Sequence, residues 1–516
     1  MQIKYGVKNT NIDVTNICLN KLLHNNIITI PSNDHNRAYH FSDPICGTLK
    51  KIFIIIDNNI TEYDDTQTIK INLNTKIITT HDNNDINQDN LDEKIFAYYF
   101  PQYHPIPEND IVFGKDFSDW DLFKTKSKDE LKSYKIPIDE PKGLGYYDPT
   151  LLKVRQRQKE LANKYGIDGF IYYHYWLENK PVMTKVLDNL LIDDEPNMPF
   201  CFCFANESWR HCYNKNPNDK TYKNFHSDGS TFRQLYNDPE THAKFLSKFF
   251  IHKNYYKIDN KPVLFVYILD NDIYLYMLKL SNDLLKYGIE GIYYIANTSK
   301  HCIKNIHEKK LNFKPNASSH FTAHGENIIP PALYNIPKIH SGLCGWNNKL
   351  RHPTSNNIVD HKPLELMNLI YKDLFKMKID KNTTQLYVIF AWNEWAEGAV
   401  LEPNSIYDEN LGLAVKKSRE IFKKTYEYFI KNTIVFLYGY GEKFINISLL
   451  VYMNCVYILE SDDFQIIIKI PGVDKLRDKL FTNPIINVHK VIKVITNDKI
   501  HIYDDITNIN IYLKLK

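Results

Sequence analysis

The sequence lacks the features that mark membrane proteins and nucleic-acid-binding proteins. No apolar run approaches the length that crosses a bilayer, and the opening MQIKYGVKNTNID has neither the basic nor the apolar region of a signal peptide. No block of lysine or arginine stands out, and the formal net charge is +3 over 516 residues. Because nucleic-acid binding usually needs a concentrated positive patch, we do not expect this protein to bind nucleic acid. These absences predict a cytoplasmic globular protein without a membrane span.

Motifs that hold a metal, a phosphate or a catalytic serine are also missing. The sequence contains no HExxH, EF-hand loop, P-loop or GxSxG, and no glycine-rich fingerprint follows a predicted strand. The eight cysteines are scattered along the chain, without a CxxC pair. This distribution favours buried, reduced thiols over a disulfide framework. We therefore expect neither a metal nor an organic cofactor.

The two ends of the chain resemble each other. Residues 30–73 align without a gap on residues 470–513, and roughly 17 of the 44 positions are identical, a similarity typical of repeated units. Both segments contain short β-branched runs, such as KIFIII and KVIKVI, that are broken by Asn/Asp turns. The sequence thus predicts two copies of one small β module, at residues 1–78 and 433–516. A very polar stretch, 79–93, is interpreted as a linker.

The middle of the chain, 94–432, alternates apolar runs with helical patterns. The runs are continuous rather than alternating, as expected for parallel strands that are buried on both faces. They lie at 95–100, 169–176, 200–206, 262–268, 291–297 and 386–392, with weaker segments at 316–320 and 341–346. Eight strands in this length predict a (β/α)₈ barrel, with a doubly wound open sheet as the alternative. One unit is clear: Asp148 is predicted to cap a helix, Pro149 to open it and Gly166 to end it.

Polar and aromatic residues follow the predicted strands. In a barrel the residues just after each strand share one mouth, where catalytic groups usually lie. Here they are mostly carboxylates, amides and aromatic rings, which suit the hydroxyls and the C–H faces of sugars. The predicted catalytic pair is Glu394 and Glu397, because two neighbouring buried carboxyl groups can have pKa values pushed apart into acid and base roles. The predicted substrate-binding residues are Tyr99, Tyr147, Asn206, Glu207, Trp209, Trp346, Trp392, Asn393 and Trp395.

Each of these features also has a structural explanation. Trp392 or Trp395 alone could fill the end of the barrel. Glu394 or Glu397 alone could cap a helix or pair with an arginine, as surface glutamates usually do. Two carboxylates at one strand end, facing a third at Glu207, favour a catalytic site instead.

Five segments carry a resemblance to a known family. FAYYFPQYHPIPEND, GYYDP, YGIDGFIYYHYW, CFANESW and AWNEWAEGAVLEP occur in this order within residues 96–403. They resemble the WbsX-type domain of polysaccharide gene clusters, which is similar in turn to the family 99 glycoside hydrolases, the endo-α-mannosidases. This resemblance implies a retaining mechanism through a 1,2-anhydro sugar. It implies that Glu394 deprotonates the 2-hydroxyl of the sugar and that Glu397 is the general acid/base.

The sequence departs from the family pattern at two places. Trp346-Asn347-Asn348 stands where Trp-Asp-Asn is usual, and Asp119-Trp120 stands where Glu-Trp is usual. We expect neither departure to touch the glutamate pair. The predicted function is a retaining glycosidase or transglycosylase acting on an α-linked glycan. The alternatives are a glycosyltransferase of surface polysaccharide synthesis and a non-catalytic glycan-binding protein whose β modules bind the ligand. The sequence gives no prediction of oligomeric state.

Overall fold

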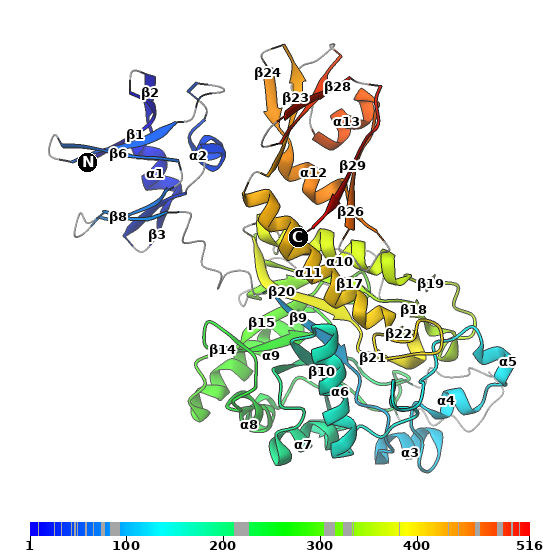
Figure 1. The fold of residues 1–516 in the computed structure, drawn as a ribbon. Coiled ribbons are helices and arrows are strands. Elements are labelled where there is room, and N and C mark those ends of the chain that lie inside the picture. The colour runs from blue at the N-terminus through cyan, green and yellow to red at the C-terminus, as the bar shows by residue number, and fades with distance from the viewer. Residues whose placement is uncertain are drawn as a thin grey trace. The chain divides into compact units, whose positions relative to one another are not determined.

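The fold is taken from a computed structural model of the chain, which divides into two compact units, residues 1–92 and 93–516 (Figure 1). The structure describes residues 1–516 except 9, 25, 32–33, 43, 46–47, 49, 57–58, 66, 74–77, 83–92, 211–225, 304–314, 323–332, 334, 381, 432, 442, 460–464, 482–488, 497–498, 505 and 516.

Eight parallel strands close into a barrel in the second unit. They are β9 (Lys94–Tyr99), β10 (Gly169–Leu177), β12 (Phe200–Phe204), β14 (Lys261–Val266), β15 (Tyr293–Asn297), β16 (Ala317–Ser319), β17 (Lys338–Leu343) and β20 (Thr383–Phe390). Each pairs with the next, and β20 pairs with β9, which closes the ring. The predicted (β/α)₈ barrel is confirmed. The alternative prediction of a doubly wound open sheet is wrong, because β9 pairs with a neighbouring strand on both of its edges.

Helices follow six of the strands in the described part of the chain. They are α6 (Leu152–Tyr165), α7 (Lys185–Asp193), α8 (Pro239–Phe250), α9 (Asn271–Leu284), α10 (Pro363–Ile379) and α11 (Asn410–Ile430). Short helices α3 (Pro107–Phe113), α4 (Asp121–Lys124) and α5 (Lys128–Leu131) lie in the long loop after β9. Gly166 ends α6 in the left-handed conformation, as predicted. The predicted start of that helix is wrong: α6 begins at Leu152, and Asp148 instead accepts a hydrogen bond from the backbone N–H of Thr150.

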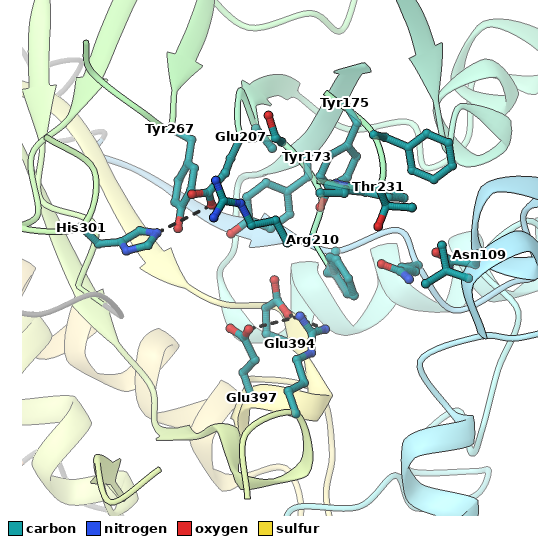
Figure 2. Close-up of a pocket in the computed structure, with 18 of the residues that line it drawn as sticks. Asn109, Tyr173, Tyr175, Glu207, Arg210, Thr231, Tyr267, His301, Glu394 and Glu397 are labelled. Atoms are coloured by element: carbon teal, nitrogen blue, oxygen red, sulfur yellow. Dashed lines mark hydrogen bonds and ion pairs between the residues drawn. The ribbon is translucent and has the colours of Figure 1, made fainter. Parts of the chain in front are cut away.

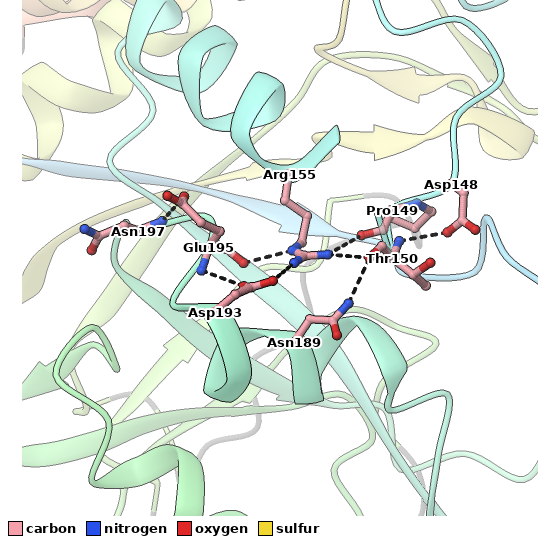
Figure 3. Close-up of polar contacts among 8 residues, drawn as sticks. All are labelled: Asp148, Pro149, Thr150, Arg155, Asn189, Asp193, Glu195 and Asn197. Atoms are coloured by element: carbon pink, nitrogen blue, oxygen red, sulfur yellow. Dashed lines mark hydrogen bonds and ion pairs between the residues drawn. The ribbon is translucent and has the colours of Figure 1, made fainter. Parts of the chain in front are cut away.

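A buried arginine ties the start of α6 to the loop after α7 (Figure 3). The Arg155 guanidinium donates to the backbone oxygens of Thr150 at 2.6 Å and Glu195 at 3.0 Å, and it forms an ion pair with Asp193. Its side chain is 1% exposed, so these acceptors replace the water that the charge has lost. The contacts fix the end of one βα unit against the next.

The first unit, 1–92, contains two small sheets and two helices. One sheet has the order β2-β1-β5-β6 and the other β3-β4-β7-β8. The strands are β1 (Gln2–Val7), β2 (Thr10–Asp13), β3 (Leu23–His24), β4 (Ile27–Ile30), β5 (Lys51–Ile56), β6 (Asn59–Tyr63), β7 (Gln67–Asn72) and β8 (Ile78–Asp82), with helices α1 (Thr15–Lys21) and α2 (Asp34–Phe41). Isoleucines of both sheets share one core with Tyr5 and Phe41. Since β8 pairs with β7 as far as Asp82, the sheet includes the first four residues of the predicted linker, 79–82.

The last segment of the chain contains two further sheets and packs on the barrel. The strands are β23 (Ile434–Tyr440), β24 (Lys443–Asn446), β25 (Val456–Ile458), β26 (Gln465–Ile470), β27 (Val491–Thr496), β28 (Lys499–Tyr503) and β29 (Ile509–Lys514), with α12 (Ser448–Asn454) and α13 (Asp474–Phe481). Tyr371 of α10 donates to the backbone oxygen of Tyr452 at 3.0 Å. Asn368 of α10 accepts from the Ile458 N–H at 2.9 Å. One continuous apolar core joins this segment to the barrel.

The two end segments have the same order of elements. From β1 to β7 in the first and from β23 to β29 in the second, two strands, a helix, two strands, a second helix and three strands follow one another, and the strand pairing matches. The eighth strand of the first segment, β8, has no counterpart among the described residues of the second. Arg37 of α2 donates to the backbone oxygen of Pro31 at 2.9 Å, and Arg477 of α13 donates to that of Pro471 at 2.6 Å. These correspondences support the predicted repeat, which stays a prediction until the two segments are superposed.

Two further expectations concern composition. Six of the cysteines lie in the described part of the chain, and all six are buried thiols outside any disulfide. Cys46 and Cys212 lie outside it. No helix among the described residues is long and apolar enough to cross a membrane.

Candidate active site

One pocket lies at the carboxyl ends of the barrel strands. Its volume is about 430 Å³, within the usual range for small-molecule sites. Every strand contributes to it directly or through the loop that follows. The residues that line it include Phe100, Tyr173, Tyr175, Glu207, Trp209, Arg210, Tyr267, His301, Arg351, Phe390, Glu394 and Glu397. Glu207 therefore shares one pocket with the predicted catalytic pair.

Glu394 and Glu397 lie on a tight turn after the last strand. β21 (Asn393–Glu394) pairs with β22 (Ala399–Val400), and the 3₁₀ turn η7 (Trp395–Glu397) connects them. Gly398 ends the turn at φ +66°, a conformation that costs glycine little. The turn points both carboxyl groups into the pocket (Figure 2). The Glu394 residue is only 3% exposed.

One guanidinium, that of Arg351, forms ion pairs with both glutamates and with a third carboxylate. Arg351, from the loop after β17, lies 3.2 Å from an oxygen of Glu397 and 3.7 Å from one of Glu394. It also forms an ion pair with Asp119, which is fully buried. Its guanidinium carbon lies 4.9 Å from the centre of the Phe100 ring, so the group is held on one face by an aromatic side chain.

Asp119 corrects one expectation from the sequence. The departures from the family pattern were not expected to touch the glutamate pair, but Asp119 is linked to both glutamates through Arg351. The physical reason is the long loop after β9, which carries Asp119 back over the mouth of the barrel. This residue therefore belongs to the electrostatics of the site.

Burial and mutual repulsion raise the pKa values of the pair. Burial raises the pKa of Glu394 well above its usual range, and the charge of Glu397 adds to this effect. Burial also raises the pKa of Glu397, whereas Arg351 opposes the rise. Because Arg351 is nearer to Glu397, the ionised form of Glu397 is stabilised more. The substrate-free pair retains a proton more readily than free carboxyl groups do, and that proton favours Glu394.

The opposite side of the pocket carries Glu207, Tyr267 and His301 (Figure 2). His301 lies 3.7 Å from a carboxylate oxygen of Glu207. Tyr173, Tyr175 and Trp209 add aromatic surface; the Tyr175 and Trp209 rings meet edge to face, 5.3 Å apart. Carboxylate, imidazole and flat rings around a cavity of this size suit a sugar, which needs both hydrogen bonds and stacking surfaces.

Of the eleven predicted site residues, four line the pocket: Glu207, Trp209, Glu394 and Glu397. Tyr99 and Trp392 do not. Side chains alternate along a strand, and Tyr99 lies on the outward face of β9, whereas Trp392 lies two residues beyond the end of β20. Tyr99 donates to Gln158 of α6 at 2.8 Å. Trp392 is fully buried and packs 5.1 Å from the Phe170 ring.

The other five predicted residues build the support behind the pocket. The Asn393 amide bridges both backbone groups of Phe100, at 2.8 and 2.9 Å, which joins the end of β9 to the turn that carries Glu394 and Glu397. Asn206 likewise bridges to both backbone groups of Ile268.

Trp346 is buried with its ring 6.0 Å from that of Phe390. Tyr147 and Trp395 both donate to Glu402, at 2.7 and 3.0 Å. None of these five predicted residues is among the residues that line the pocket.

Sequence reasoning missed several residues of the site. Tyr173 and Tyr175 sit within a predicted strand, and the pattern of β10 could have shown that they share a face. Arg351 and His301 carry no local signal, since each lies in a loop that only the fold brings to the pocket. Tyr267 directly follows β14, so its place at a strand end could have identified it. Glu402 lies in the quoted motif, and burial raises its pKa to about 7.

The chain matches one protein family and two curated relatives. The family model described as "Glycosyltransferase WbsX" matches residues 95–329 and 305–412. The "uncharacterized protein WxcX" of Xanthomonas campestris pv. campestris, in strains B100 and ATCC 33913, is 26% identical over 353 residues, which cover 63% of this chain and 48% of the relative. The chain thus spans about half the length of these relatives.

Among solved structures, two of an endo-α-mannosidase of family 99 from Bacteroides thetaiotaomicron are similar to the chain. Each is 15% identical, with TM-scores of 0.42 and 0.41. They cover 65% and 64% of this chain, and 99% and 98% of their own.

Proposed function

Because the chain belongs to the WbsX glycosyltransferase family, we propose that its barrel is a carbohydrate-active enzyme that breaks or exchanges a glycosidic bond in an α-linked glycan. One observation carries the proposal: two buried carboxyl groups with raised pKa values share one guanidinium at the mouth of the barrel. Perturbed carboxyl pairs in a cleft are typical of acid–base sites.

The proposed mechanism retains configuration and passes through a 1,2-anhydro sugar. Glu394 accepts the proton of the 2-hydroxyl, and the freed oxygen attacks the anomeric carbon. The glycosidic bond breaks as Glu397 gives its proton to the leaving oxygen. Water or an acceptor hydroxyl then gives its proton to Glu397 and opens the anhydro ring, and Glu394 returns the first proton to O2. O2 attacks from the face opposite the leaving oxygen, and the two glutamates serve oxygens on adjacent carbons of one sugar, which fits their places on one turn.

The free site places a condition on this mechanism. The proton of the free pair favours Glu394, whereas the first step needs it on Glu397. A bound sugar that hydrogen-bonds Glu394 through its 2-hydroxyl stabilises the ionised form of that group, because a donor to a carboxylate lowers its pKa. The proton is thereby shifted to Glu397, beside the leaving oxygen. In this mechanism, substrate binding itself gives Glu394 the ionised form and Glu397 the protonated form that the first step needs.

A transferase that uses a nucleotide-sugar donor is the second candidate, and the family name favours it. The two candidates differ in their substrates. The test is to incubate the full chain with a panel of α-mannosides and other α-linked oligosaccharides, and separately with nucleotide sugars plus acceptors, and to read products by mass spectrometry. Cleavage or exchange of an oligosaccharide without nucleotide supports the proposal. Product formation only with a nucleotide sugar supports the transferase. No product from any mixture supports the glycan-binding alternative.

A further inference from the structure

The sheet β25-β26-β29 has an outer face with an aromatic row. Val456, Ile458, Ile466 and Ile468 point into the main core. The residues between them point the other way, and the strand register aligns Tyr457, Ile467 and Tyr512 across the three strands. Tyr457 is 40% exposed and Tyr512 is 70% exposed, whereas Ile467 between them is 2% exposed. The row therefore presents two tyrosines on either side of a covered isoleucine.

The spacing of the row suits a chain of sugar rings. Tyr457 and Tyr512 stand two strand spacings apart, about 10 Å from backbone to backbone. A pyranose unit extends a glycan by about half of this distance, so the rings can meet alternate sugars. Tyrosine offers a flat apolar surface and a polar hydroxyl with little conformational entropy to lose.

Charge on the same face is positive. Lys469 is exposed beside the row, and its ammonium group lies 5.5 Å from the centre of the Tyr457 ring. The ammonium group of Lys372, from α10, lies 5.2 Å from the same ring. Lys514 is exposed two residues beyond Tyr512. The remaining outward positions on these three described strands are Gln465 and Asn510, so none of them carries a carboxylate.

The first unit differs at the matching positions. There the register aligns His24, Ile27 and Asn72, so neither tyrosine has a counterpart. The position that matches Lys469 holds Thr29. The core isoleucines are similar in both segments, whereas the outer face has changed. The two tyrosines and Lys469 are therefore particular to the second segment and are not required by the elements that the two segments share.

We propose that this face, the Tyr457–Tyr512 platform, binds an anionic glycan. Tyr457 and Tyr512 stack on the sugar rings, and Lys372, Lys469 and Lys514 pair with carboxylate or sulfate groups along the chain. The choice of a glycan over other polyanions rests on the function proposed for the barrel. The platform lies on a separate sheet, so binding to it is measured without turnover.

The test is affinity electrophoresis of the full chain in gels that contain polygalacturonate, alginate, neutral dextran or no polymer. We expect retardation by the two acidic polymers and little by dextran. Tyr512→Ala should weaken the retardation by on the order of tenfold, because truncated aromatic anchors often dominate an interface. Tyr512→Phe keeps the ring and should retain most of the binding. Lys469→Gln should weaken binding and make it less sensitive to salt.

The matched control is Tyr440→Ala, which removes a 53% exposed tyrosine from β23 in the neighbouring sheet and should leave retardation unchanged. Circular dichroism checks that each variant is folded. Absence of retardation, equal retardation by dextran, or retardation that Tyr512→Ala leaves intact would overturn the proposal. Tight binding of a single-stranded oligonucleotide together with none of the acidic polymers would also overturn it. If the full chain binds the acidic polymers but converts no glycan, this result would contradict the function proposed for the barrel and leave the platform proposal standing.

Discussion

Arg351 lies between Asp119, Glu394 and Glu397, and its charge influences how readily each carboxyl group loses its proton. Three carboxylates near one cation cannot all be ionised without a large repulsion. A proton is therefore kept in the cluster, which is what an acid–base pair requires. The site depends on this residue although it touches no reacting bond.

Replacement of Arg351 by Met should raise the pKa values of both glutamates, because the cation that opposes their rise is gone. The acidic limb of the pH–rate profile should then move to higher pH, and the rate at neutral pH should fall by roughly tenfold or more. Arg351→Lys keeps the positive charge and should move the acidic limb part of the way back to its position in the unmodified protein. The measurement is kcat/KM against pH, with the substrate found by mass spectrometry.

Arg210→Met serves as the control for this change, since Arg210 lines the same pocket from the loop after β12. Its removal should change KM more than the position of the acidic limb. An unshifted limb in Arg351→Met, with the protein folded by circular dichroism, would contradict the role assigned to this arginine.

Glu402 should make stability depend on pH. Its pKa is about 7 in the folded protein against 4.5 for an ordinary glutamate, so between these values the folded state holds a proton that the unfolded chain has released. The stability from this group is full below pH 4.5 and falls as pH rises to 7, by a total of roughly 3 kcal/mol. Glu402→Gln stays neutral and should flatten this fall. Urea unfolding at pH 5, 6, 7 and 8 measures it; an equal slope in the variant would refute the assignment.

At the scale of elements, buried polar contacts hold the βα units in register. Arg155→Ala should lower the free energy of unfolding by about 3 kcal/mol, because it leaves Asp193 and two backbone oxygens without their donor. Arg157→Ala on the same helix is the matched control. Its pair with Glu160 is exposed and should be worth under about 1 kcal/mol. Urea denaturation compares the two, and equal losses would contradict this account of Arg155.

The strands were predictable from sequence, whereas the inward and outward sides of each strand were not. Continuous apolar runs located six of the barrel strands, and the weaker segments 316–320 and 341–346 located β16 and β17. Strands that are buried on both faces carry no polar alternation, so nothing in the runs showed that Tyr99 points outward. The glutamate pair was predictable because both residues lie on one short turn. Arg351 was not, because the loop that carries it has no motif and reaches the site only through the fold.

At the scale of the whole molecule, the repeat makes a structural prediction. An experimental structure should show residues 1–78 and 433–516 superposing element by element, from β1 on β23 to β7 on β29. The buried arginines Arg37 and Arg477 should fall at equivalent places, since each donates to the backbone oxygen of the proline six residues before it. Different strand order in the two segments would contradict the repeat.

The central claim is that Glu394 and Glu397 perform different proton transfers in one retaining reaction. The most direct measurement compares Glu394→Gln and Glu397→Gln on two glycosides of the same sugar, one with a good leaving group and one with a poor leaving group. Glu397→Gln should be slowed on the order of 10²–10⁴-fold on the poor leaving group and much less on the good one, because only the poor one needs a proton as it departs. Glu394→Gln should be slowed on both, since O2 is activated in either case. Unchanged activity in both variants, or the leaving-group dependence appearing in Glu394→Gln instead, would contradict the assignment.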